Sequence, residues 1–204
     1  MDSIYDRQRD MVDVERPGAA IVVGVGGVGS WVALGLALAG VRRIALVDDD
    51  VVEKTNLNRT PFKESHIGLA KVHAMAELIM ERRSECIVWP FECRAEDLPD
   101  YTENMLWGFR VYDCRDSITP LKIPKTDRCQ ITGGYDGTGV TIHINPNYDS
   151  IFGSDAVRYR VVPSFVGAPM FLASVIVNYA CLPNSRVRDE RIMSFDLNDL
   201  PNTF

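Results

Sequence analysis

A glycine cluster between two short apolar runs limits the possible folds of this chain more than any other feature of its sequence. Residues 20–23 read Ala-Ile-Val-Val, residues 24–29 read Gly-Val-Gly-Gly-Val-Gly, and residues 44–47 read Ile-Ala-Leu-Val. Residues 30–39, between the glycines and the second apolar run, have an apolar helical pattern. This order predicts a strand, a tight turn, a helix and a second strand.

The glycines have the spacing of a nucleotide-binding turn. Gly24, Gly26 and Gly29 fit the pattern G-x-G-x-x-G. In that pattern the first glycine allows a sharp turn, the second lets a phosphate approach the backbone, and the third lets the helix pack against the strand. Asp48 follows Gly29 by 19 residues, where a carboxylate can accept hydrogen bonds from ribose hydroxyls. The pattern predicts a nucleotide site but does not distinguish NAD, FAD and ATP.

Two other interpretations of this stretch are weaker. The glycines could form a packing turn that binds no ligand. Residues 19–41 also carry no charge and are long enough to span a bilayer. The glycines crowd the centre of that run, however, and glycine is unfavourable inside a continuous helix. A strand, a turn and a helix therefore explain the sequence better.

The composition agrees with a globular protein built around one core. The 204 residues are 25% charged with a net charge of −6, which argues against general affinity for nucleic acids. The acidic N-terminus lacks a signal-peptide pattern, so we expect a cytoplasmic protein that does not bind membranes. The five cysteines include no C-x-x-C pair, so we expect no zinc site, and a reducing compartment fits them.

Alternating strand and helix patterns continue along the chain and end in a hairpin. We expect strands at 86–91, 108–113, 131–135, 140–144 and 191–197, helices at 64–83, 95–106 and 165–180, a helix or loop at 117–130, and a crossover loop at 145–162. Gly68 and Pro99 should break the first two of these helices. The fold class is therefore α/β, a Rossmann-like doubly wound, mostly parallel sheet with an antiparallel extension. Residues 1–18 form an N-terminal arm and residues 19–204 a single domain.

Several motifs in a fixed order resemble those of one enzyme family. They are Tyr5-Asp6-Arg7-Gln8, similar to an R-Y-x-R-Q arm; the glycine turn at 24–29; residues 48–59, which match D-x-D-x-V-x-x-S-N-L-x-R; Gly68-Leu69-Ala70-Lys71, similar to G-x-x-K; and Asp113-Cys114-Arg115-Asp116, similar to D-C-x-D. Over nearly its whole length the chain resembles the ThiF/MoeB/HesA-type adenylyltransferases, which use ATP to activate ubiquitin-like and sulfur-carrier proteins. The resemblance implies that residues 19–204 form an ATP-binding adenylation domain.

The resemblance also implies how ATP is held. Asp48 would hold the ribose hydroxyls, and Asn56, Arg59 and Lys71 would gather around the triphosphate. The implied nucleotide-binding residues are Gly24, Gly26, Gly27, Gly29, Asp48, Asp50, Asn56, Asn58, Arg59 and Lys71.

For catalysis, the resemblance implies that Asp116 binds Mg²⁺ near the α-phosphate. It also implies that Arg7 reaches into the ATP site of the other subunit of a dimer. Arg59 and Lys71 complete the implied catalytic set. A carboxylate that attacks the α-phosphorus must overcome repulsion between two anions, so cations and a metal aimed at the developing charge are the expected catalyst.

The chain departs from many relatives in its cysteines. It lacks the two C-x-x-C pairs that bind a structural zinc, so the implied cofactors are ATP and Mg²⁺ without zinc. Residues 145–167, where thioester-forming relatives place a cysteine, contain none. We expect Cys93, Cys129 and Cys181 to be small buried residues. The reaction should therefore stop at the acyl-adenylate.

The resulting functional hypothesis is a Mg²⁺-ATP-dependent adenylyltransferase that activates the C-terminal carboxylate of a β-grasp, ubiquitin-like or sulfur-carrier protein, or of a peptide. We expect a homodimer that binds neither nucleic acid nor membranes. A non-catalytic relative that only binds a ubiquitin-like partner remains the alternative. An NAD-dependent oxidoreductase is disfavoured, because the sequence offers no catalytic His/Lys/Tyr constellation and its histidines, at 66, 73 and 143, are scattered.

Overall fold

The computed structural model describes residues 4–8, 10–12, 18–116, 121, 130–144, 164–182 and 191–199. Its strands are β1 (Ala20–Val23), β2 (Arg43–Val47), β3 (Ile87–Phe91), β4 (Arg110–Asp113), β5 (Gln130–Asp136), β6 (Gly139–Ile144) and β7 (Arg191–Asp196). Its α-helices are α1 (Gly27–Ala39), α2 (Lys71–Arg82), α3 (Thr102–Met105) and α5 (Gly167–Cys181). Single 3₁₀ turns lie at Lys54–Asn56, Glu64–His66, Ala95–Asp97 and Leu197–Asp199.

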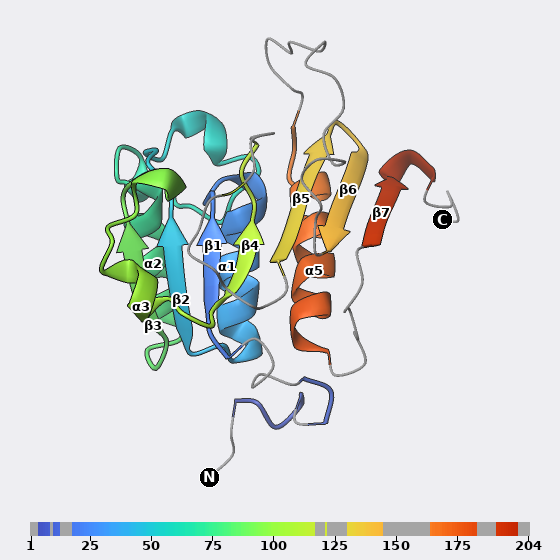
Figure 1. Ribbon diagram of the computed structural model, residues 1–204. Coiled ribbons are helices and arrows are strands. Elements are labelled where there is room, and N and C mark those ends of the chain that lie inside the picture. Colours follow the sequence, from blue (N-terminus) through green and yellow to red (C-terminus); the bar gives the residue numbers. More distant parts are fainter. Residues whose placement is uncertain are drawn as a thin grey trace.

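The seven strands form one sheet in the order β3-β2-β1-β4-β5-β6-β7. Neighbouring strands from β3 to β5 run parallel, whereas β6 and β7 are added antiparallel. Figure 1 shows β1, β2 and β4 pointing the same way, so their carboxyl ends share one edge of the sheet. The predicted α/β fold with a mostly parallel sheet and an antiparallel extension is confirmed.

The central strand is buried on both faces, as expected for a parallel strand covered on each side. All four residues of β1 are buried. Ala20 and Val22 belong to the larger core, which α1, α2 and α5 cover. Ile21 and Val23 belong to a smaller core on the other face, closed by residues from 95 to 109. Among the described residues, no helix is both long and apolar enough to cross a bilayer.

The predicted helix breaks are present, whereas one helix start was wrong. Gly68 has a φ of +88°, a left-handed conformation that ends the turn at Glu64–His66, and α2 then begins at Lys71. Pro99 lies between the turn at Ala95–Asp97 and α3. Helix α1 begins at Gly27 and not at residue 30, because the last glycines of the cluster adopt helical geometry.

Some predictions lie outside the described residues. These are most of the segment predicted as a helix or loop at 117–130 and the crossover loop predicted at 145–162. The division into an arm at 1–18 and a domain at 19–204 stays a prediction.

Candidate nucleotide site

The glycine turn joins β1 to α1 at the carboxyl edge of the sheet. Gly24 has a φ of +80°, and its N–H donates to the carbonyl oxygen of Val47 at 2.8 Å. A Cβ on Gly24 would lie 2.9 Å from backbone atoms of Cys114 and Arg115, and one on Gly29 would lie 1.8 Å from the carbonyl oxygen of Gly24. The sharp turn and the close helix packing predicted for these two glycines are therefore present.

The middle of the turn is open. Gly26 is the N-cap of α1 and offers no side chain to the N–H groups of the first helical turn. A Cβ on Gly26 would meet no atom within 4 Å. The first N–H groups of a helix have no acceptor within the helix and carry partial positive charge. An anion can therefore approach the backbone at Gly26.

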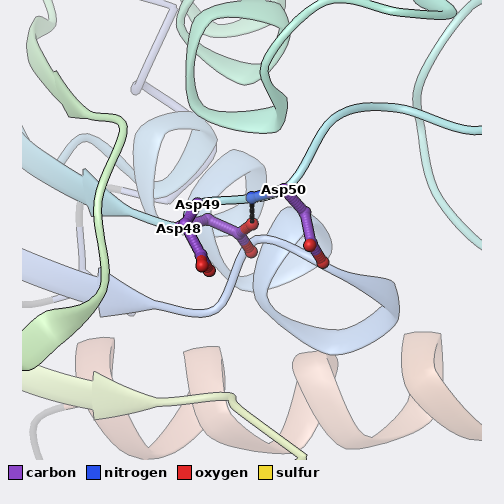
Figure 2. A group of neighbouring side chains, drawn as sticks. All are labelled: Asp48, Asp49 and Asp50. Atoms are coloured by element: carbon purple, nitrogen blue, oxygen red, sulfur yellow. Dashed lines mark hydrogen bonds between the residues drawn. The ribbon is translucent and has the colours of Figure 1, made fainter.

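Asp48 lies directly after β2, beside the glycine turn. One oxygen of its buried carboxylate accepts the N–H of Val25 at 2.5 Å, and the other accepts the N–H of Asp50 at 2.9 Å (Figure 2). Burial raises the pKa of the Asp48 carboxyl, while the nearby Lys71 ammonium and the two N–H donors act in the opposite direction. The carboxylate is thus fixed at the position predicted to meet a ribose.

Lys71, at the start of α2, places its ammonium beside the Asp48 carboxylate. Its buried ammonium lies 2.6 Å from Asp50 Oδ2 and 3.9 Å from Asp48 Oδ1. Lys71 is also the first residue of α2, where a cation is unfavourable to the helix dipole, so the two carboxylates compensate its charge. The Asp50 side chain is 68% exposed. Asp50 can therefore be displaced from Lys71 by another anion and return to solvent, whereas the Lys71 ammonium stays buried.

Figure 2 shows the side chains of the triplet formed by Asp48, Asp49 and Asp50 side by side. One carboxylate oxygen from each lies within 4.8 Å of the others. Asp49 accepts a hydrogen bond from Arg94 Nε at 3.1 Å. Lys71 and Arg94 therefore offset much of the negative charge of the triplet.

The Asn-Leu-Asn-Arg segment lies beside the start of α1. Asn56 is buried, and its side-chain oxygen accepts the N–H of Glu53 at 3.0 Å. The carbonyl oxygen of Arg59 accepts the indole N–H of Trp31, from α1, at 2.9 Å. These bonds fix the segment against α1. The side-chain oxygen of Asn56 is thus committed to holding this loop in place.

The Arg59 guanidinium donates to neutral oxygens. It bonds the carbonyl of Thr55 at 2.6 Å and the side-chain oxygen of Asn58 at 3.1 Å. Asn58 in turn donates to the carbonyl of Ser164 at 2.9 Å. No carboxylate pairs with Arg59 among the residues that the structure describes, so its charge is available to an anionic ligand.

Asp116 lies at the end of the D-C-x-D motif. Within that motif, Arg115 forms two hydrogen bonds of 2.9 Å with the buried carboxylate of Asp113. The backbone of Cys114 and Arg115 packs against Gly24, so the exposed Asp116 follows directly after the contact with the glycine turn. Within the described part of the chain, no residue hydrogen-bonds or pairs with the Asp116 carboxylate.

Arg7 is not brought to this edge of the sheet. Gln8 donates to the carbonyl of Ala39, the last residue of α1, at 2.7 Å, and the Arg83 guanidinium lies 4.5 Å from the centre of the Tyr5 ring. The arm therefore docks at the opposite end of the molecule from the glycine turn (Figure 1). The 13 residues of α1 alone span about 20 Å.

Tyr135 lies beside the glycine turn, which the sequence analysis did not predict. Its hydroxyl lies 3.0 Å from the point where a Cβ on Gly27 would be. Strand β5 runs parallel to β4, so its last residues reach the same edge of the sheet as the glycine turn. A tyrosine near the end of a predicted parallel strand was the available signal.

The chain is similar in sequence to one protein family and to several of its characterised members. The model of the ThiF family matches residues 9–130, which is more than half of the chain. The chain is 48% identical over 102 residues to the tRNA threonylcarbamoyladenosine dehydratase of Escherichia coli, covering 48% of this chain and 37% of that protein. It is 37% identical over 119 residues to the adenylyltransferase and sulfurtransferase MOCS3 of Mus musculus, covering 56% of this chain and 25% of the relative.

Two solved structures are also similar. The E. coli dehydratase TcdA in complex with ATP is 33% identical, with a TM-score of 0.51 over 62% of this chain and 58% of that one. E. coli MccB with the peptide MccA-N7isoASN has a TM-score of 0.67 at 18% identity, over 96% of this chain and 72% of that one, which shows a shared fold. The chain spans only about a quarter to two fifths of the curated relatives MOCS3 and the dehydratase.

Proposed function

This chain belongs to the ThiF family, and from that premise we propose that it is an ATP-dependent adenylyltransferase. It binds Mg²⁺-ATP beside the glycine turn and transfers AMP to a carboxylate, which releases pyrophosphate. The proposal rests on the contacts of the Lys71 ammonium with the Asp48 and Asp50 carboxylates, next to the open start of α1. A glycine turn that only packed a helix would need no such cation.

The reaction requires charge to be neutralised more than it requires a general base. The nucleophile is an ionised carboxylate, and both it and the triphosphate are anions. Arg59 now donates to neutral oxygens, and Lys71 contacts the exposed Asp50. Arg59 can turn to phosphate oxygens without leaving a carboxylate unpaired among the described residues. Lys71 can exchange its contact with the exposed Asp50 for a phosphate oxygen while it stays near Asp48. Both cations would thereby stabilise the charge that develops on the α-phosphate and on pyrophosphate.

Mg²⁺ fits the oxygen donor available at Asp116. Carboxylate oxygens suit this ion, which is usually held by one or two carboxylates together with substrate phosphates. The Asp116 carboxylate is exposed next to the glycine turn and has no partner among the described residues. When bound, the ion neutralises charge on the phosphate oxygens. Asp116 would hold it at the end of β4.

Arg7 would act in a second copy of the chain. Its arm is fixed to the far end of its own α1, so Arg7 cannot also lie beside its own glycine turn. A homodimer in which each arm reaches the partner's nucleotide would use Arg7 as a further cation on the triphosphate.

The acceptor is a carboxylate carried by another molecule, and the C-terminal tail of a β-grasp protein or a peptide is our candidate. Relatives named for a sulfurtransferase and for a tRNA modification show that the family name alone does not specify this carrier. We predict that the carrier is not a nucleic acid.

The acyl-adenylate should be the end product of this chain. Among the described residues, Cys86 and Cys181 are buried, and Cys93 and Cys114 are partly buried. Burial raises the pKa of the Cys93 and Cys114 thiols, which disfavours the thiolate that a thioester would need. Cys129 lies outside the described residues.

The experiment is to incubate the chain with Mg²⁺-ATP and a panel of β-grasp proteins and peptides that end in Gly-Gly. Pyrophosphate formation, together with an AMP-sized mass increase on one carrier, is the expected result. Both should be lost in a folded Asp116→Ala variant. Release of ADP and orthophosphate would contradict adenylylation. ATP binding without turnover of any carrier would favour the non-catalytic alternative.

A further inference from the structure

Tyr135 closes one side of the glycine turn. The point where a Cβ on Gly27 would lie is 3.0 Å from the Tyr135 hydroxyl, 3.5 Å from Cβ of Pro169 and 3.6 Å from Cδ of Arg59. A Cβ on Gly26, the preceding residue, would have no atom within 4 Å. The start of α1 is therefore open at Gly26 and lined at Gly27 by a hydroxyl and the stem of a cationic side chain.

The Tyr135 hydroxyl belongs to a hydrogen-bonded series that leads to this cation. The hydroxyl lies 2.7 Å from Oγ of Ser164, and either group can be the donor. The carbonyl of Ser164 accepts from Asn58 at 2.9 Å, and Asn58 accepts from the Arg59 guanidinium at 3.1 Å. Strand β5, the segment before α5 and the loop before residue 60 are thus joined by hydrogen bonds near Gly27.

The chemistry of this group suits a phosphate oxygen. The hydroxyl can donate one hydrogen bond, and Arg59 has only neutral acceptors among the residues that the structure describes. The first N–H groups of α1 add partial positive charge on the same side. A hydroxyl, a guanidinium and backbone N–H groups together make a set of hydrogen-bond donors. Among the described residues, no carboxylate bonds the Tyr135 hydroxyl or the Arg59 guanidinium.

We propose that the Tyr135 hydroxyl donates a hydrogen bond to a phosphoryl oxygen of ATP bound at the start of α1, leaving Ser164 when the nucleotide enters. This inference rests on the proposed function and adds a binding residue to it. The competing interpretation is structural: Tyr135 and Ser164 only fasten the segment before α5 to β5.

Three variants separate the two interpretations. Tyr135→Phe removes the hydroxyl, whereas Ser164→Ala removes its present partner and keeps the hydroxyl. Tyr179→Phe is the matched control, because it removes a tyrosine hydroxyl that bonds Sδ of Met193 at 3.3 Å, away from the glycine turn. Affinity for Mg²⁺-ATP is measured by calorimetry, and the unfolding midpoint of each variant is measured in parallel.

We expect Tyr135→Phe to weaken Mg²⁺-ATP binding about 10- to 100-fold, the loss typical of a hydrogen bond to a charged group, with little change in the unfolding midpoint. Ser164→Ala and Tyr179→Phe should bind Mg²⁺-ATP like the wild type.

Two results would overturn the assignment of Tyr135 alone: wild-type affinity in Tyr135→Phe, or equal losses in Tyr135→Phe and Ser164→Ala. Failure of the wild-type chain to bind Mg²⁺-ATP would instead overturn the proposed function, and the assignment of Tyr135 with it.

Discussion

At the scale of single residues, the balance of charge around Asp48 is the feature that ligand binding would change most. Its buried carboxylate is held by two N–H donors and by a lysine 3.9 Å away that is itself shared with Asp50. Burial still raises the pKa of Asp48. The position is therefore kept at some cost in stability, which is common for residues retained for binding.

The raised pKa of Asp48 predicts how stability depends on pH. The folded protein holds the Asp48 proton more tightly than the unfolded chain, so the contribution of this group is present below the ordinary pKa of 3.8 and is lost as pH rises through the folded pKa. Asp48→Asn lacks this titration, so its stability relative to wild type should rise with pH above about 4. Urea unfolding at several pH values measures the difference, and a pH-independent difference would contradict a raised pKa at Asp48.

At the scale of elements, two glycines of the turn between β1 and α1 have different roles: Gly29 matters for packing, and Gly26 for access of a ligand. A Cβ on Gly29 would lie 1.8 Å from a backbone oxygen that cannot move freely, whereas one on Gly26 would meet nothing within 4 Å. Gly26 has a φ of −83° and a ψ of −145°, outside the α and β regions, so alanine there would carry backbone strain but no steric clash. The same substitution should therefore act in two different ways three residues apart.

We expect Gly29→Ala to destabilise the fold by about 3 kcal/mol or more, because overpacking against backbone is poorly relieved. Gly26→Ala should cost less, about 1 to 2 kcal/mol for its unusual backbone conformation. It should still weaken Mg²⁺-ATP binding, because its methyl group enters the space of the phosphate. Urea unfolding and calorimetry give the two quantities. Normal ATP affinity in Gly26→Ala would mean that phosphate does not approach this residue.

The elements also show what a sequence can and cannot predict. The succession of strands and helices along the chain follows from alternating sequence patterns, and the breaks at Gly68 and Pro99 follow from backbone chemistry that is local to each residue. The start of α1 was misplaced because glycines are poor helix formers, and packing against β1 overrides that preference. Tyr135 was missed because pairing between β5 and β4 brings it to Gly27, more than 100 residues away in the chain.

At the scale of the whole molecule, the arm and the nucleotide site lie at opposite ends of the sheet (Figure 1). The sequence motif placed Arg7 in the catalytic set but contained no information on distance. The docked arm and a catalytic role for Arg7 are compatible if Arg7 acts in a second copy of the chain, since its own copy cannot bring it to the site. Affinity for ATP should then depend on association of the chains.

We expect the affinity of the wild-type chain for Mg²⁺-ATP to increase with protein concentration as dimers form, and the affinity of Arg7→Ala to be weaker and independent of concentration. Arg42→Ala, an exposed arginine at the same end of the sheet as the arm, is the matched control and should behave like wild type. Calorimetry over a dilution series, with sedimentation to follow association, measures both. An Arg7→Ala dimer with wild-type affinity would remove the role in trans.

The most direct test of the nucleotide site is calorimetric titration of the purified chain with Mg²⁺-ATP, with ATP in the absence of Mg²⁺, and with NAD. Lys71→Met is compared with Lys63→Met, which breaks a surface ion pair with Glu81. We predict that Mg²⁺-ATP binds more tightly than ATP alone, that Lys71→Met weakens binding about 10-fold or more while Lys63→Met does not, and that NAD does not bind. Tight NAD binding, or no ATP binding by the folded chain, would contradict an adenylylation site at this edge of the sheet.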